Sequence, residues 1–268
     1  YNLNKYVIGN YNTNNYSNLK SAEQINPNSE EVIKQMAAHN LIMDDDLKSE
    51  LYLKKLKDNQ QLDLQSIDYC EDLLESTPQN GTLITHGMID SYGAHYNQIT
   101  NQKRTDVEII NLDFLQSKTY QQKLINKGYI IPETNNIDIS FFKEFCDKNS
   151  DKNIALSLTI PKDYFIPIID KIYVVGLVFE YHLNEPTSGL MEKNKSLWSE
   201  KMNKAVILSK EKGTIKLASN YLPMLLNLRK YFKEKGDNPK VLEIDRQIEM
   251  ISKKCNKTKK ISKIKSSY

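Results

Sequence analysis

Cysteine is scarce in this sequence, and its three cysteines form no pattern. Cys70, Cys146 and Cys255 lie far apart in a chain of 268 residues, and their number is odd. A disulfide framework needs paired cysteines, and a structural metal site needs closely spaced ones. We therefore predict buried or incidental thiols, with neither a disulfide scaffold nor a metal site.

Long apolar runs are missing as well. The most apolar stretch, 164–179, is interrupted by Asp170 and Lys171, so it falls short of the roughly 18 to 20 residues of a membrane-spanning helix. The composition, 39% hydrophobic and 26% charged, is that of a folded globular protein. Disorder of the whole chain is excluded, and we expect this part of the chain to be soluble.

Arginine is rare, and the positive charge is unevenly distributed. The formal net charge is +3, but residues 253–268 hold seven lysines and no acidic residue, so the rest of the chain carries −4. Nucleic-acid-binding domains concentrate basic residues over a face of the fold, and arginine is the better phosphate ligand. We expect no nucleic-acid partner. The basic tail is predicted to be a solvated, frayed terminus, and contact with anionic lipid is the alternative.

The common motifs of nucleotide, acyl-transfer and zinc sites are incomplete. A Walker A pattern is missing, Gly87 and Gly93 do not complete a dinucleotide fingerprint, and Ser91 lacks the flanking glycines of a nucleophile elbow. His86 and His95 are nine residues apart, whereas a helical zinc pair needs a spacing of four. The sequence predicts no catalytic residue, no metal and no cofactor.

The first third of the chain divides into two segments. Residues 1–28 are rich in asparagine and tyrosine and are predicted to form an extended or irregular arm. Residues 29–79 show apolar residues at helical spacing and are predicted to be a helical segment.

The middle segment, 80–183, alternates between β-rich and helical patterns. Strand patterns occur at 82–85, 107–112, 154–160 and 172–181, and helical patterns at 89–100, 117–127 and 141–148. Such alternation is typical of right-handed βαβ units with parallel strands. The predicted fold class is α/β, as a small three-layer, parallel-sheet (Rossmann-like) domain flanked by amino- and carboxyl-terminal helices.

The remainder is predicted to be a helical hairpin region, 190–252, followed by the basic tail, 253–268. Its helical patterns cover 196–208, 215–234 and 239–253. The last two resemble a tetratricopeptide-type hairpin, although no second copy follows in register. A tetratricopeptide-like end and a single hairpin that caps the α/β domain both remain open.

The candidate ligand site follows the first predicted strand. In open α/β sheets, ligands bind beyond the carboxyl ends of the parallel strands. The loop and helix after Thr85 contain His86, Asp90, Ser91 and His95, and Asn111 ends the second strand. These five side chains are the predicted ligand-binding residues.

Structural roles compete with this assignment. Asp90 has the position of a helix cap, and Asp106 is placed to pair with Arg104 at the opposite end of the sheet.

The same region resembles a known family. The sequence from Thr85 to Leu124 follows a pattern close to T-N-G-D-N-D-T-F-P-L-W-Y-x-Q, then R-x-D-V, then a strand that ends in N-L. The matching residues are Thr85, Gly87, Asp90, Tyr96, Gln98, Arg104, Asp106, Val107, Asn111, Leu112 and Leu115. The pattern is similar to the soluble C-terminal region of a Bacteroidota membrane-protein family of unknown function described as protein O-mannosyltransferase-like. The resemblance implies a periplasmic location in the cell envelope.

The chain departs from that pattern in the most polar part of the loop. Met88 and Ile89 replace an acidic residue and an asparagine, and Gly93 and His95 replace a proline and a tryptophan. Asp90 remains as the acidic group of the loop. The many-helix membrane half in which glycosyl transfer would be expected is not part of this sequence, so the resemblance does not carry transferase activity to it.

We therefore expect a non-catalytic binding or scaffold module of an envelope protein assembly, linked to secretion or surface glycoconjugates. The partner would be an envelope protein complex. Membrane association is expected through an anchor outside this sequence, as in a lipoprotein, or through the basic tail. The alternative is a carbohydrate- or small-ligand-binding or glycan-processing domain, with Asp90 as acid or base and His86, His95 or Asn111 positioning the ligand.

Overall fold

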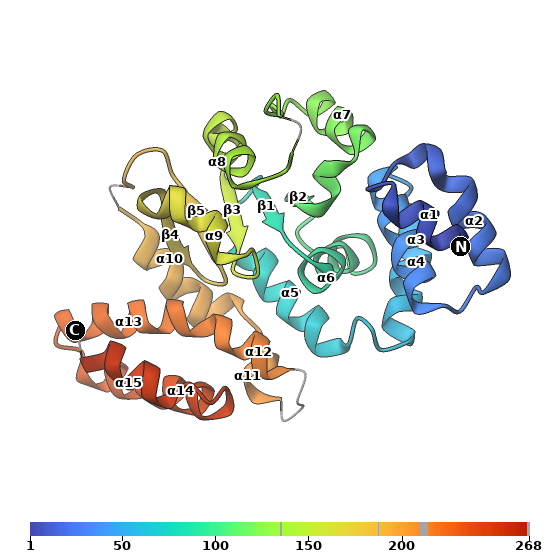
Figure 1. Cartoon of the computed structure of the whole chain (residues 1–268). Helices are drawn as coiled ribbons and strands as arrows, with labels where there is room; N and C mark the ends of the chain where they lie inside the picture. Colours follow the sequence, from blue (N-terminus) through green and yellow to red (C-terminus); the bar gives the residue numbers. More distant parts are fainter. Residues whose placement is uncertain (135, 187, 210–213, 267–268) are drawn as a thin grey trace.

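The computed structural model describes residues 1–134, 136–186, 188–209 and 214–266 (Figure 1). The chain begins with helices α1 (Asn2–Ile8), α2 (Tyr16–Ile25), α3 (Glu30–Ile42), α4 (Asp46–Asp58) and α5 (Leu64–Ser76). Asp45 and Asp63 cap α4 and α5 by accepting hydrogen bonds from the amides of Lys48 and Ser66.

The predicted arm, 1–28, is helical, so the prediction of an extended segment was wrong. Tyr6 and Leu19 are fully buried. Two tyrosines meet His39 of α3: the Tyr6 hydroxyl lies 3.3 Å from its Nδ1, and the Tyr16 ring stacks on it with 4.0 Å between ring centroids. Asparagine has a low intrinsic helix propensity, but this tertiary packing outweighs it.

Within the described residues, five short strands form one sheet: β1 (Thr82–Thr85), β2 (Glu108–Asn111), β3 (Ile154–Ser157), β4 (Ile172–Val175) and β5 (Val178–Tyr181). Their order is β2-β1-β3-β5-β4. β1 pairs in parallel with β2 and β3, whereas β5 pairs antiparallel with β3 and β4. The helices between the strands are α6 (Met88–Ile99), α7 (Lys118–Asn126), α8 (Ile139–Lys148) and α9 (Lys162–Phe165).

The sheet confirms the mixed α/β class, but the prediction of an all-parallel sheet was wrong. The predicted strand 172–181 is a hairpin that reverses at Gly176, whose φ is +57°. A Cβ atom there would lie 2.2 Å from Ser76 Oγ, so both the backbone angle and the packing require glycine. The amide of Gly176 donates to Asn194 Oδ1 at 2.7 Å, which fixes the turn.

Both faces of the sheet are buried against helices. In β1, Ile84 packs into one hydrophobic cluster and Leu83 into another, because successive side chains of a strand point to opposite faces. The first cluster includes side chains of α3, α4, α7 and α8, and the second includes those of α5 and the carboxyl-terminal helices. The carboxyl edge of β1, β2 and β3 is thereby held between two packed layers.

The carboxyl-terminal part is helical, as predicted, but its boundaries differ. Its helices are α10 (Leu190–Ser196), a π-helical turn (Leu197–Lys201), α11 (Ala205–Leu208), α12 (Thr214–Ala218), α13 (Leu222–Glu234), α14 (Asn238–Lys254) and α15 (Thr258–Ser266). α13 and α14 form a helical hairpin, and α15 lies beside α14 (Figure 1).

Two predictions for this region were wrong. The predicted helix 196–208 is broken near Lys204, which has a left-handed backbone with φ of 59°. The predicted frayed tail, 253–268, contains the end of α14 and the helix α15. Ile261 of α15 is buried, and Lys265 pairs with Asp245 of α14, so the tail packs instead of fraying.

The break near Lys204 has a clear cause in α5. The carboxylate of Asp72 is fully buried and accepts hydrogen bonds from the amides of Asn203, at 2.7 Å, and Lys204, at 3.0 Å. The Tyr221 hydroxyl donates to the same carboxylate at 2.6 Å. Asp72 therefore joins the carboxyl-terminal helices to the sheet layer.

We predict that Asp72→Ala destabilises the whole fold. The substitution leaves three donors without their acceptor, and a loss of about 3 kcal/mol in the free energy of unfolding is expected. Urea denaturation measures the change. Asp58→Ala, at an exposed carboxylate that ends α4, is the control and should change stability by less than about 0.5 kcal/mol. Equal effects of the two variants would contradict the role given to Asp72.

Candidate functional site

Polar side chains gather at the carboxyl edge of the parallel strands, where the sequence predicted a site. We call this group the carboxyl-edge cluster. Its members are Thr85, His86, Asp90, Ser91, Asn111, Asp113, Ser157 and Thr159, which come from the ends of β1, β2 and β3 and from the start of α6. The cluster therefore contains four of the five predicted site residues.

Asp90 lies at the centre of this cluster and is 1% exposed. Its Oδ2 accepts hydrogen bonds from the hydroxyls of Ser157 and Thr159, the latter at 2.7 Å. Its Oδ1 has no hydrogen-bond partner in the described part of the chain. Burial raises the pKa of Asp90 to about 6, although the two hydroxyl donors oppose that shift.

Asp90 does not cap α6, so that structural prediction was wrong. The helix begins at Met88, with Gly87 as its N-cap, which places Asp90 in the first turn. Its side chain instead reaches across to the loop that follows β3. The carboxylate thus ties α6 to β3.

Ser91 and Asn111 are also engaged inside the fold. The Ser91 and Thr85 hydroxyls lie 2.6 Å apart, and both residues are fully buried. Asn111 Oδ1 accepts from the amide of Asp113 at 2.8 Å, which shapes the turn after β2. Neither side chain is arranged to attack or bind a solvent-borne substrate.

His86 is the most accessible of the predicted residues in the cluster. Its side chain is 35% exposed, and its Nε2 lies 3.6 Å from Asp113 Oδ1. The other oxygen of Asp113 accepts from the amide of Gly87 at 3.3 Å. His86 and Asp113 therefore form the solvent side of the cluster.

His95 does not belong to the cluster. It lines a cavity of about 500 Å³ between α4, α6, β2 and α7, together with Asp44 and Lys123. Burial lowers the pKa of His95 to about 3, so the ring is neutral at physiological pH. The prediction that His95 joins Asp90 at one site was wrong.

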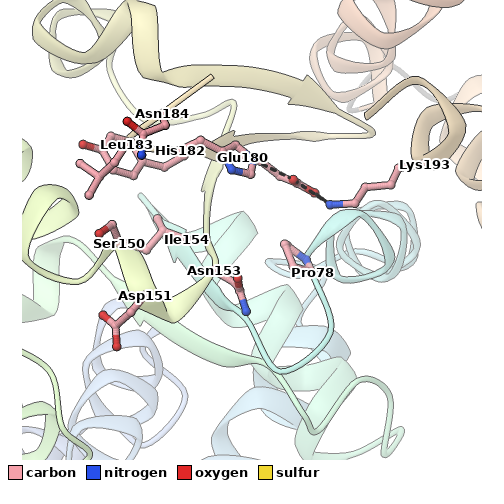
Figure 2. Close-up of a pocket in the computed structure, with 11 residues that line it drawn as sticks. Pro78, Ser150, Asp151, Asn153, Ile154, Glu180, His182, Leu183, Asn184 and Lys193 are labelled. Carbon is pink, nitrogen blue, oxygen red and sulfur yellow. Dashed lines mark hydrogen bonds and ion pairs between the residues drawn. The ribbon is translucent and has the colours of Figure 1, made fainter. Parts of the chain in front are cut away.

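A second polar cavity opens at the amino edge of the parallel strands (Figure 2). We call this cavity of about 420 Å³ the amino-edge pocket. Glu180 of β5 is 2% exposed, and both its oxygens lie 2.9 Å from Lys193 Nζ of α10. His182 Nε2 lies 3.1 Å from Glu180 Oε2. The other lining residues are Pro78, Ser150, Asp151, Asn153, Ile154, Tyr181, Leu183 and Asn184.

Figure 2 shows Glu180, His182 and Lys193 along one side of the pocket, whereas Asp151 lies apart from them beside Ser150. Lys193 reaches towards Glu180 from α10, while Pro78 and Asn153 stand on the other side. Sequence reasoning missed Glu180 and Lys193. The available signal was a charged residue inside the apolar strand V-F-E-Y, since a buried strand carries a carboxylate only when it is paired.

The predicted pair of Arg104 and Asp106 is confirmed. Arg104 Nε and Nη2 donate to the two carboxylate oxygens at 2.9 and 3.0 Å. The guanidinium lowers the pKa of Asp106 to about 2, and it also donates to the carbonyls of Leu74, Thr77 and Pro78. This pair fixes the loops between α5, β1 and β2.

The described residues contain neither a candidate metal site nor a candidate membrane-spanning helix. Among them, no three His, Cys, Asp or Glu side chains are grouped closely enough to hold a metal ion. In the same residues, no helix has the length and apolar character needed to cross a bilayer.

A comparison with protein families shows to which family the chain belongs. The sequence profile described as TMEM260-associated domain 2 matches residues 66–263, about three quarters of the chain. The chain belongs to the TMEM260-associated domain 2 family. No curated protein and no solved structure matches it.

The TMEM260-associated domain 2 match extends from α5 to α15. It includes the whole sheet, the carboxyl-edge cluster and the amino-edge pocket, whereas α1 to α4 precede it. The sheet and the carboxyl-terminal helices are thus one family unit.

We predict that Asp90→Asn changes the pH dependence of stability. A folded-state pKa of about 6 lies above the ordinary value of 3.8, so ionisation of Asp90 disfavours the folded state. Its contribution to stability is present below about pH 4 and is lost as the pH rises to about 6, a change of about 3 kcal/mol. Asp90→Asn removes this loss, so the variant gains stability relative to the parent between pH 4 and pH 7.

Urea denaturation at several pH values measures this difference. Asp58→Asn, at an exposed carboxylate, is the matched control. Parallel pH profiles of the parent chain and Asp90→Asn would contradict the description of Asp90 as a buried ionisable group.

Proposed function

We propose that this chain is a non-catalytic binding module of a periplasmic protein assembly in the bacterial cell envelope. The observation that carries the proposal is the state of the carboxyl-edge cluster. Asp90 is buried and bound by two hydroxyls, and Ser91 is bound by Thr85. Side chains that hold the fold together in this way are poorly placed for chemistry on a substrate.

The requirements of acid–base catalysis support this interpretation. A general acid or base must lie within hydrogen-bond reach of the reacting group. Glycoside hydrolysis further needs two carboxylates that flank the scissile bond. Asp90 is nearly inaccessible, and the hydroxyls of Ser157 and Thr159 occupy one of its oxygens. The cluster therefore suits a structural role.

The exposed side of α14 is the surface we assign to partner binding. Leu242 is 60% exposed and Met250 is 38% exposed, and they lie eight residues apart on one helical face. Exposed apolar side chains on a rigid helix are typical anchors of protein–protein contacts. Membership of a TMEM260-associated family supports a partner that is a membrane protein.

The resemblance found in the sequence adds a second part to this proposal. The loop pattern around Asp90 resembles the soluble region of Bacteroidota O-mannosyltransferase-like membrane proteins. We infer from it that the assembly is linked to secretion or to surface glycoconjugates.

We predict that Leu242→Glu with Met250→Glu abolishes recovery of the partner. Two carboxylates on this face of α14 would oppose burial in an interface. Affinity purification from the native envelope in mild detergent, followed by mass spectrometry, measures the result. Ile25→Glu, at an exposed apolar residue of α2, is the control and should retain the partner. A parent chain that recovers no envelope protein in stoichiometric amount would contradict the proposal.

A second candidate function is the binding of a small polar ligand, such as a carbohydrate, or its processing. The amino-edge pocket favours it, because a buried carboxylate there lies between an amine and an imidazole. Such groups both donate and accept hydrogen bonds, which suits a ligand rich in hydroxyl or amine groups.

If the pocket binds such ligands, Glu180→Gln weakens the binding at least tenfold, because it removes the charge that orients Lys193 and His182. Chemical-shift changes during titration with a panel of monosaccharides and amino acids measure the affinity. Glu192→Gln, an exposed residue of α10, is the control. Absence of any response from the parent chain would eliminate this candidate.

A further inference from the structure

Positive charge is concentrated at the carboxyl-terminal end of the molecule. Residues 222–266 contain thirteen Lys and Arg against five Asp and Glu, a net charge of +8. With a total of +3, the rest of the chain therefore carries −5. In Figure 1 this basic part is the pair of α13 and α14 with α15 beside them, at the edge of the molecule away from α7 and α8.

Three of the seven lysines in residues 253–268 have partners within the chain. Lys253 pairs with Glu249 at 2.7 Å, and Lys265 pairs with Asp245. Lys254 donates to the carbonyls of Val206 and Ser209 at 2.8 and 2.6 Å. The contacts of Lys254 and Lys265 hold the end of α14 and the end of α15 against neighbouring parts of the chain, whereas Lys253 and Glu249 form an exposed pair within α14.

The remaining four lysines lie in α15 or directly before it, and together we call them the α15 basic face. They are Lys257, Lys259, Lys260 and Lys263, and all four are exposed. None of them has an acidic partner in the described part of the chain. The acidic residues nearest in sequence are already paired, because Glu249 binds Lys253 and Asp245 binds both Arg229 and Lys265.

Packing fixes the direction of two of these lysines, Lys259 and Lys263. Ile261 is 6% exposed, and Ile264 packs against the same hydrophobic cluster. At 100° per residue, Lys259 and Lys263 point away from Ile261. They are four residues apart on one face, where like charges repel and destabilise a helix. A negatively charged surface facing α15 would relieve that repulsion.

The chemistry of the face favours lipid headgroups over nucleic acid. Its cations are lysines, which act as separate point charges, whereas guanidinium groups grip phosphates in a bidentate manner. The described residues of α15 include no aromatic side chain on which a base could stack. Ser262 lies between Lys260 and Lys263, is exposed and can also donate to headgroup oxygens.

We propose that the α15 basic face docks on the anionic surface of a lipid bilayer. Each lysine held near such a surface strengthens binding about fivefold, so the four lysines together supply on the order of several hundredfold. This contact does not depend on the protein partner assigned to α14, and each can fail without the other.

The test is co-sedimentation of the full chain with vesicles. One set consists of phosphatidylcholine, and the other contains roughly a third phosphatidylglycerol. The patch variant replaces Lys257, Lys259, Lys260 and Lys263 with glutamine. The control variant makes the same change in net charge at four other exposed lysines, Lys20, Lys57, Lys118 and Lys162. Thermal unfolding checks that both variants remain folded.

We expect the parent chain and the control variant to bind the anionic vesicles and not the neutral ones. The patch variant should lose at least a hundredfold in affinity, and high salt should release the parent chain. Equal binding to both vesicle types, no binding, or an equal loss in the two variants would overturn the proposal. So would binding to a DNA duplex through the same lysines in the absence of vesicle binding, which would assign the face to nucleic acid.

Discussion

The hydrogen bonds of the Asp90 carboxylate determine how the carboxyl edge of the sheet is closed. They join the first turn of α6 to Ser157 at the end of β3 and to Thr159 just beyond it. Ser157 is 67 residues further along the chain, so the contact links two separate βα connections. A buried carboxylate is costly unless it is hydrogen-bonded, and these hydroxyls partly compensate for its desolvation. At the edge that binds ligands in many α/β proteins, Asp90, Ser91 and Asn111 are here part of the core, while His86 and Asp113 form the solvent side.

The remaining surfaces of the protein are consequently the places where binding is expected. The amino-edge pocket has a buried charge pair, and α14 has exposed apolar side chains. The basic face of α15 gives the molecule a positive end opposite a negatively charged body. Asp72 of α5 ties the carboxyl-terminal helices to the layer of helices and strands around the sheet. The surfaces on the sheet layer and on these helices therefore keep fixed positions relative to each other.

Local sequence patterns predicted the elements that depend on local signals. The strand 82–85 is found as predicted, and the helical pattern 117–127 corresponds to α7, which Ser117 caps. The hairpin at Gly176 was missed because apolar residues continue on both sides of the turn and hide it. The helices of residues 1–28 were missed because their stability comes from burial against α3.

The candidate site shows the same division between local and long-range information. Asp90 was identified from its position after β1, but its partners Ser157 and Thr159 are distant in sequence, and a single sequence does not pair such positions. His95 was grouped with Asp90 although five residues on a helix turn a side chain by about 140°. That rotation directs it into the cavity beside α4.

Chemical labelling of carboxylates tests the central claim most directly, which is that Asp90 is closed off from solvent. The folded chain is treated with a water-soluble carbodiimide and an amine, and the modification of each carboxylate is followed by mass spectrometry. The structure predicts that Asp90 stays unmodified while the exposed Asp58 reacts, and that Asp90 reacts once the chain is unfolded. Modification of Asp90 in the folded chain at the rate of Asp58 would contradict the account and return the carboxyl-edge cluster to consideration as an active site.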